Sequence, residues 1–317
     1  MKWWWQERPP LWTLPLAPLS LLYAAGSRLH RASVRAVRAS VPVISVGNLT
    51  AGGAGKTPVT LFLARRLAQR RKKPAILSRG YGRDSREPLR VTSGTPVRLC
   101  GDEPLWLARQ GFDVWVGPSR ALLADLAVKA GADVLLLDDG LQHHALARDL
   151  DVIVADASNP LGNGALLPRG PLRELPGALS RVRRGLLWLT RADLPRHPLA
   201  ASLGGFPLVE SLYEPHAELR GQRVFLFAGI ARPSGFEASA VSLGAIVTGR
   251  RWFRDHHWYS PADLAGLRRE ASGSRLLTTE KDLVRIAEPA GIAALHVEVR
   301  VTAGEAALDA ALAEAAP

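Results

Sequence analysis

A glycine-rich loop that ends in a lysine and a threonine is the part of this sequence best suited to chemistry. It follows an apolar segment at residues 43–46, precedes a helix-like segment at residues 59–67, and consists of Thr50, Ala51, Gly52, Gly53, Ala54, Gly55, Lys56 and Thr57. Strand, glycine loop and helix in this order form a phosphate-binding loop, because backbone amides and the helix N-terminus can face phosphate oxygens. We expect Lys56 to reach the β- and γ-phosphates of ATP, and Thr57 to ligate Mg²⁺.

This loop departs from the common pattern at its first position, where Thr50 replaces the usual glycine. Gly52 and Gly53 supply flexibility close by. A glycine-rich turn that binds nothing is the alternative, but Gly-Lys-Thr between a strand and a helix favours phosphate binding.

A pair of carboxylates, Asp138 and Asp139, follows the apolar segment at residues 134–137. Ligands of parallel α/β sheets bind at the carboxyl ends of the strands, where a metal-binding carboxylate of a phosphate-binding loop is needed. We therefore predict a Mg²⁺ site from Thr57, Asp138, Asp139 and Gln142, and leave open which aspartate ligates directly. An Asp-Asp-Gly turn without a metal is the alternative.

Apolar strand-like segments alternate with helix-like segments along the chain, which predicts a mainly parallel α/β sheet. The first set of expected strands covers residues 41–46, 74–77, 113–116, 134–137, 152–154 and 186–189, and the second covers 224–227, 245–247, 276–278 and 295–299. Tyr213, Glu214 and Pro215 read as a linker. We therefore predict an N-terminal segment (1–40), a phosphate-binding-loop domain (41–215) and a smaller α/β domain (216–317).

The composition limits the classes of binding partner but does not identify a single one. A formal charge of +12 favours an anionic partner: nucleic acid, a lipid surface or a phosphorylated substrate. Nucleic acid is disfavoured, because neither an aromatic-interleaved basic module nor a helix-turn-helix pattern is visible. The single cysteine, Cys100, has no partner within the chain for a disulfide, which fits a reducing compartment.

The N-terminal segment combines tryptophans, an apolar stretch and arginines. Trp3, Trp4, Trp5 and Trp12 accompany the apolar residues 11–25, and basic residues follow from Arg28 to Arg38. Fifteen or so apolar residues with two prolines are too few to span a bilayer, whereas tryptophans and arginines suit its surface. We expect an interfacial anchor. A signal peptide and a helix packed on the protein's own core are the alternatives.

Blocks around these elements, in order, resemble the tetraacyldisaccharide 4'-kinase family of lipid A biosynthesis. They are the loop at residues 47–58 with its missing first glycine, Ser-Arg-Gly-Tyr-Gly at 78–82, Gly-Asp-Glu-Pro at 101–104, Asp-Asp-Gly-Leu-Gln-His at 138–143, residues 167–174, Phe-Ala-Gly-Ile at 227–230, Asp-His-His at 255–257 and Thr-Glu-Lys-Asp at 279–282. The similarity extends to about residue 285.

This resemblance implies a kinase at the cytoplasmic face of the bacterial inner membrane. It would use ATP and Mg²⁺ to phosphorylate the 4'-hydroxyl of a lipid A disaccharide 1-phosphate, in a cleft between two α/β domains. It also implies that Asp102 is the base that accepts the hydroxyl proton and that His256, from the second domain, orients it; Lys56 completes the expected catalytic set. An N-cap role for Asp102 and an exposed loop histidine are the alternatives.

For several other residues the sequence predicts a shared region of the site but does not assign separate roles. Glu103, Gln142 and His143 are placed near the metal or behind its ligands, and Arg79, Arg120, Arg173 and Lys281 are candidates for phosphate contacts. Each of these four basic residues is equally suited to a surface ion pair.

Two functions of other classes compete with the kinase. A membrane-associated ATPase switch that positions other proteins would use the same loop, but such switches commonly carry a lysine where this chain has Ala51, and they have no use for the Asp102 and His256 blocks. A GTP-dependent metallochaperone is disfavoured by one cysteine and the lack of a histidine-rich tract.

Overall fold

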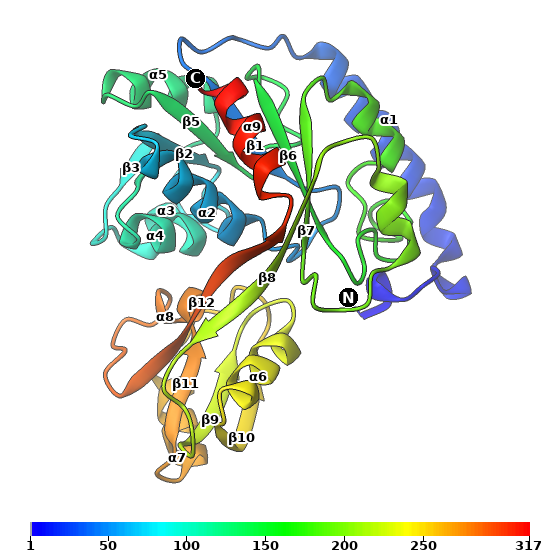
Figure 1. The fold of residues 1–317 in the computed structure, drawn as a ribbon. Coiled ribbons are helices and arrows are strands. Elements are labelled where there is room, and N and C mark those ends of the chain that lie inside the picture. Colours follow the sequence, from blue (N-terminus) through cyan, green and yellow to red (C-terminus); the bar gives the residue numbers. More distant parts are fainter. Residues whose placement is uncertain (1) are drawn as a thin grey trace. The chain divides into compact units, whose positions relative to one another are not determined.

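The computed structural model describes residues 2–317, which fold into two compact units. The first unit contains the chain up to Arg79, then Gly117–Leu212 and Val299–Pro317. The second contains Gly80–Val116 and Tyr213–Glu298. Strands β8 (Leu208–His216) and β12 (Ile292–Ala303) each have residues in both units (Figure 1).

The first unit is built on a parallel sheet in the order β8-β7-β6-β1-β5-β2. Its other strands are β1 (Val43–Gly47), β2 (Pro74–Ser78), β5 (Val134–Asp138), β6 (Leu150–Asp156) and β7 (Gly185–Thr190). Its helices are α1 (Ala17–Ser33), α2 (Lys56–Gln69), α5 (Arg120–Lys129) and α9 (Glu305–Ala315), with short 3₁₀ helices at Lys2–Trp5, Leu11–Leu16, Pro176–Arg181 and Pro198–Leu203.

Complete burial of the central strands explains why they read as unbroken apolar segments. Every residue of β1, β5 and β6 is buried, as expected where helices cover both faces of a parallel sheet. In the pairing of β1 with β5, Val46 lies opposite Asp138. The loop after β1 and the carboxylates after β5 therefore start at the same edge of the sheet.

The second unit contains a parallel sheet in the order β10-β9-β11-β12 and an antiparallel pair, β3 with β4. Its strands are β3 (Leu89–Val91), β4 (Asp113–Val116), β9 (Arg223–Ala228), β10 (Ile246–Trp252) and β11 (Arg275–Thr279). Its helices are α3 (Val97–Cys100), α4 (Asp102–Arg109), α6 (Pro233–Ser242), α7 (Pro261–Ala271) and α8 (Glu280–Leu283). Helix α4 contacts α8, which brings segments far apart in the sequence together.

The mixed α/β class with a large, mostly parallel sheet is confirmed, and each expected strand overlaps an observed one. The linker assigned to Tyr213, Glu214 and Pro215 is wrong, because these residues belong to β8. Pro215 was the reason for the wrong assignment, because proline is uncommon inside strands. It is tolerated because it lies next to the last residue of β8, beyond Leu208–Glu210, where β8 pairs with β7.

The two units also differ from the expected domains 41–215 and 216–317. Residues 80–116 fold with the second unit, and residues 299–317 return to the first, where α9 contacts β6. The expected division assumed that each domain is one continuous segment. Long-range pairings decide the actual division, and a strand pattern does not reveal which strands pair.

Backbone and side-chain hydrogen bonds fix the start of the N-terminal segment on the first unit. The Trp4 indole donates to the carbonyl oxygen of Pro168 at 3.1 Å, and the Asn163 amide donates to the Trp4 carbonyl oxygen at 2.8 Å. A Cβ atom on Gly52 would come within 3.1 Å of the Trp5 ring. The start of the N-terminal segment therefore lies against the glycine-rich loop as well as against residues 163 and 168 of the first unit.

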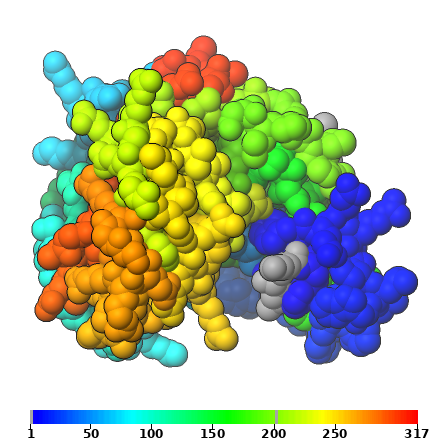
Figure 2. Space-filling view, turned by 90° about the horizontal axis from the view of Figure 1, so that it is seen from below, coloured from blue at the N-terminus to red at the C-terminus, as the bar shows by residue number. Residues whose placement is uncertain are grey.

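Beyond these contacts, the N-terminal segment displays large apolar side chains. Leu11, Trp12, Leu21, Leu22 and Leu29 are all more than 60% exposed. Figure 2 shows this segment, in blue, at the surface of the molecule. Among the described helices, none has the length and apolar character needed to cross a bilayer.

Candidate active site

The loop after β1 leads into α2, and its variant first position is explained by local conformation. Gly52 and Gly55 have φ angles of 117° and 83°, which residues with a side chain rarely adopt. Thr50, by contrast, has no positive φ. The Thr50 hydroxyl instead accepts a hydrogen bond from the Asn48 amide at 2.9 Å. A glycine is therefore not required where Thr50 stands.

Lys56 lies at the start of α2 and contacts one residue that precedes the loop and one that follows β5. Its ammonium group donates to Asn48 Oδ1 at 3.0 Å and lies 3.4 Å from Asp139 Oδ1. The structure thus brings together the lysine of the loop and the aspartate pair, as the sequence predicted. Asn48 was not predicted as a site residue, although its place just before the loop could have suggested it.

The two aspartates after β5 have different partners. Asp138 is 2% exposed and accepts a hydrogen bond from the Thr60 hydroxyl of α2 at 3.0 Å. Both carboxylate oxygens of Asp139 accept from Arg173 Nη1, at 2.7 and 2.8 Å. Burial raises the pKa of Asp139, but the charges of Lys56 and Arg173 outweigh it and lower this pKa to about 2. Asp139 is therefore ionised at every physiological pH.

Gln142 connects this aspartate pair to a neighbouring carboxylate. Its amide nitrogen donates to the carbonyl oxygen of Asn48 at 3.1 Å and to Glu174 Oε2 at 3.2 Å, and its amide oxygen accepts from Arg173 at 3.3 Å. Glu174 also pairs with Arg181 at 2.6 Å. Gln142, predicted as a fourth metal ligand, thus shares Arg173 with Asp139 and has its own side chain engaged by protein groups.

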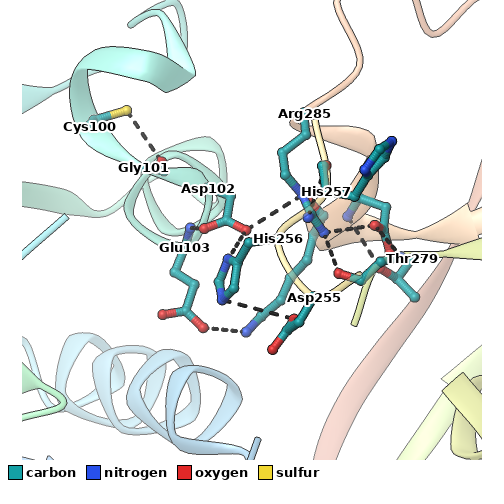
Figure 3. Close-up of polar contacts among 12 residues, drawn as sticks. Cys100, Gly101, Asp102, Glu103, Asp255, His256, His257, Thr279 and Arg285 are labelled. Carbon is teal, nitrogen blue, oxygen red and sulfur yellow. Dashed lines mark hydrogen bonds and ion pairs between the residues drawn. The ribbon is translucent and has the colours of Figure 1, made fainter. Parts of the chain in front are cut away.

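Asp102 and His256 form a hydrogen-bonded pair in the second unit (Figure 3). Asp102 is the first residue of α4, is 5% exposed, and accepts the Glu103 amide at 2.9 Å through Oδ1. His256 follows β10 in a turn with a φ of 57°, and its Nδ1 lies 2.8 Å from Asp102 Oδ2. The pairing predicted for these residues is present, although both lie in one unit and not in two.

Charge around this pair favours an ionised carboxylate beside a protonated imidazole. Burial raises the pKa of Asp102, but the hydrogen bond and charge of His256, together with Lys281 and Arg285, outweigh it and lower this pKa. The hydrogen bond that His256 makes to the Asp102 carboxylate raises the pKa of His256 against the opposing effect of burial. The carboxylate is therefore ionised and can accept a proton, which a general base must do.

The surroundings of the pair add a second ion pair and an exposed ring. Lys281 of α8 lies 2.5 Å from Glu103 Oε1, so this lysine is matched to a carboxylate of the same unit. The ring of Tyr81 lies 5.4 Å from that of His256 and is 70% exposed. Tyr81 belongs to the Ser-Arg-Gly-Tyr-Gly block, for which the sequence predicts no role.

The remaining predicted residues fall in different environments. Arg79 is exposed, whereas Arg120 is buried and donates to the carbonyl oxygen of Gly117 at 3.1 Å. Burial, reinforced by neighbouring arginines, lowers the pKa of His143 to about 4, so this imidazole is neutral near pH 7. Of the four predicted phosphate contacts, Arg173 is the one that lies against the aspartate pair.

Family comparison identifies a match along almost the whole chain. The family model described as tetraacyldisaccharide-1-P 4'-kinase matches residues 12–316. A tetraacyldisaccharide 4'-kinase of Anaeromyxobacter dehalogenans strain 2CP-C is 46% identical, over 96% of this chain and 90% of its own. One from Methylobacterium sp. strain 4-46 is 41% identical, over 96% of this chain and 94% of its own.

A solved structure is similar in fold as well as in sequence. It is the Aquifex aeolicus protein LpxK, described as an "apo" form in complex with ATP, and it superposes with a TM-score of 0.79 at 28% identity. The similarity covers 96% of this chain and 99% of that one. Loop, aspartate pair and Asp102–His256 pair therefore occur in a fold that has been solved with ATP.

Proposed function

This chain belongs to the tetraacyldisaccharide-1-P 4'-kinase family and is an ATP-dependent kinase of lipid A biosynthesis, and from that premise we propose which of its residues do the chemistry. Lys56 and the loop bind and polarise the phosphates of ATP, and Asp102 accepts the proton of the acceptor hydroxyl. The observation that carries the proposal is the 2.8 Å contact between buried Asp102 and His256.

For the nucleotide, the proposal rests on the loop and the group that its lysine contacts. Phosphoryl transfer needs positioning and neutralisation of the charge that spreads over the transferred group. Residues Thr50–Thr57 would supply backbone amides and the N-terminal end of α2. When a triphosphate enters, Lys56 exchanges Asn48 and Asp139 for phosphate oxygens, which bear more negative charge.

Mg²⁺ fits the donors that lie beside this loop. Thr57 and Asp138 offer a hydroxyl and a carboxylate, Asp139 a second carboxylate, and such hard oxygens are what Mg²⁺ binds, usually with phosphate oxygens completing the set. We assign Thr57, Asp138 and Asp139 to the ion and Gln142 to a supporting position. When bound, Mg²⁺ would supply positive charge that offsets the negative charge of the transferred phosphoryl group.

For the acceptor, the proposal rests on the state of Asp102. A hydroxyl attacks more readily when its proton is taken up as the new bond to phosphorus forms. His256 donates to Oδ2 and the Glu103 amide to Oδ1, so both oxygens are oriented before substrate binds. The loop belongs to the first unit and this pair belongs to the second.

One assay tests the activity and separates it from the ATPase switch. Purified protein is given radiolabelled ATP, Mg²⁺ and a 1-phosphorylated tetraacyldisaccharide in mixed micelles, and labelled lipid is measured alongside free phosphate. We expect label in the lipid, dependence on both the acceptor and Mg²⁺, and little phosphate release without acceptor. ATP hydrolysis that proceeds unchanged whether or not the acceptor is present would favour the switch and contradict the kinase.

We also propose that the N-terminal segment attaches the protein to the cytoplasmic face of the inner membrane. Leu21 and Leu22 of α1 are 71% and 68% exposed, and Arg28 and Arg31 lie on the same helix. Burial of leucine side chains and attraction of arginines to anionic lipid act together at a membrane surface. A positively charged protein also fits a lipid substrate that carries a phosphate.

Vesicle binding tests this attachment. Replacing Leu21 and Leu22 together by glutamate removes apolar surface and adds charge that anionic lipid repels, so co-sedimentation with phosphatidylglycerol vesicles should fall at least about tenfold. Val241→Glu is the control, since Val241 is an exposed apolar residue of α6. Equal sedimentation of the double variant, the control and the wild type would refute attachment through α1.

A further inference from the structure

Arg285 is a buried cation behind the Asp102–His256 pair, and the chemistry proposed above gives it no task. It follows α8, is 5% exposed, and its Nε lies 3.5 Å from Asp102 Oδ2. Figure 3 shows its side chain reaching toward Asp102 and the turn that carries His256. A buried charge destabilises a fold unless it is paired and hydrogen-bonded, so the partners of this guanidinium indicate what it is for.

The guanidinium is matched mainly by Asp282, a carboxylate with no exposed surface. Arg285 Nη2 donates to Asp282 Oδ1 at 2.7 Å. The same oxygen accepts the Tyr259 hydroxyl at 2.7 Å and the Gly229 amide at 2.8 Å, and Oδ2 accepts the Thr279 hydroxyl at 2.6 Å. With four donors in fixed places, Asp282 determines where Arg285 lies.

Arg285 in turn donates hydrogen bonds to the backbone next to His256 and to the backbone carbonyl that His256 contacts. Its Nη1 donates to the carbonyl oxygen of His257 at 3.2 Å, and its Nη2 donates to that of Gly229 at 3.0 Å. The Gly229 carbonyl oxygen also accepts the His256 amide at 3.0 Å. His256 has a φ of 57°, a conformation that a histidine keeps only where its surroundings enforce it.

The backbone around Gly229 is packed so closely that a side chain would not fit there. A Cβ atom on Gly229 would lie 2.8 Å from the Arg254 carbonyl oxygen and 3.3 Å from Asp282 Oδ1. Any side chain there would push the His256 turn away from Asp282. The conformation of His256 therefore depends on two neighbouring features. One is the glycine at position 229, and the other is the buried ion pair between Arg285 and Asp282.

We propose that Arg285, fixed by Asp282, is a positioning residue that sets the geometry of the Asp102–His256 pair for proton transfer. The inference rests on the proposed role of Asp102 as the base. Arg285 touches Asp102 and the His256 turn at once, so it fixes both members of the pair relative to each other. It acts through these two residues and contacts no substrate.

A double-mutant cycle tests this role. Arg285→Gln and Arg285→Lys are made in the wild type and in Asp102→Ala, and kcat and KM are measured for ATP and the lipid acceptor. In the wild type, Arg285→Gln should lower kcat by roughly tenfold to a hundredfold, as loss of outer supporting contacts commonly does, with KM for ATP unchanged. Arg285→Lys should recover part of this loss. In Asp102→Ala, Arg285→Gln should change kcat by less than about threefold, because residues that act as a unit are not additive.

Equal loss in both backgrounds would overturn the inference, because a purely structural arginine lowers activity whether or not Asp102 is present. If Asp102→Ala itself keeps wild-type turnover, the base assignment fails first, and that result is distinct from additivity. Arg251→Gln is the matched control, since Arg251 pairs with Glu270 at 2.9 Å in the same unit and should leave kcat unchanged.

Should Arg285→Gln fail to fold by circular dichroism, the cycle is run with Tyr259→Phe. This change removes one hydrogen bond to Asp282, and the ring keeps its edge-on packing against Phe227. The criterion is the same: a loss of kcat confined to the background with Asp102 supports positioning, and no loss or an equal loss overturns it.

Discussion

Asp102→Ala should lower the turnover of lipid phosphorylation by roughly 10²- to 10⁴-fold, the range expected when a general base is lost. The carboxylate is buried, oriented by His256 and the Glu103 amide, and held ionised by its surroundings. Nothing else at that position in α4 can take up the proton once the side chain ends at Cβ. Affinity for ATP should stay within about twofold of wild type, because the loop and Lys56 belong to the other unit.

Steady-state kinetics with the lipid acceptor and calorimetric titration of a non-hydrolysable ATP analogue measure the two expectations separately. Asp113→Asn is the control, since Asp113 is a carboxylate of the same unit in a solvent-exposed pair with Arg90. Its turnover should match wild type. Retention of more than about a tenth of wild-type turnover in Asp102→Ala would remove Asp102 from the chemistry.

The pH dependence provides an internal check on the same assignment. His256 lowers the pKa of Asp102, so the wild type should stay active well below neutral pH. In His256→Gln that effect is lost and burial raises the pKa of Asp102. The acid side of the kcat/KM profile should therefore move to higher pH. An unchanged acid side would mean that the group titrating there is not Asp102.

Much of the first unit was predictable because its local patterns and its long-range geometry agree. Val43–Gly47 and Val134–Asp138 are buried on both faces and read as apolar segments, and parallel strands place their carboxyl ends at one edge. Lys56 and Asp139 therefore had to lie close together once both segments were assigned to one parallel sheet.

The division into units was not predictable from the same patterns. Residues 80–116 carry the Asp102 block yet fold with residues from beyond 213, through contacts such as that between α4 and α8. The hydrophobic periodicity within residues 80–116, or within the residues that follow 213, does not indicate that the two segments contact each other. The resemblance to a family indicated the Asp102–His256 pair, whereas nothing in the sequence pattern links two residues that lie 154 positions apart.

Residues that support the site were missed for a related reason. Thr60 and Arg285 contact Asp138 and Asp102, which are distant from them in sequence. Asn48 contacts Lys56 across the loop. Arg285 does follow Asp282 by three residues, a spacing that permits a pair in a helical turn. Such pairs are usually exposed and weak, so only the burial seen in the structure distinguishes this one.

Lys56→Ala should lower kcat by roughly 10²- to 10³-fold, the usual cost of losing one preorganised charge aimed at the transition state, and should also weaken ATP binding. The second effect separates it from Asp102→Ala, which leaves the nucleotide site intact. Loss of the ammonium group also removes one of the cations that pair with Asp139 and leaves Arg173, so negative charge next to the phosphates is less well compensated.

Turnover and analogue binding measured as above test this, with Lys129→Ala as the control, since Lys129 is an exposed lysine at the end of α5 in the same unit. The control should match wild type in both. Lys56→Ala protein that folds normally yet binds the analogue and phosphorylates lipid like wild type would show that the triphosphate binds elsewhere. The carboxylates after β5 would then have no role in transfer, because their proposed task depends on phosphates held by this lysine.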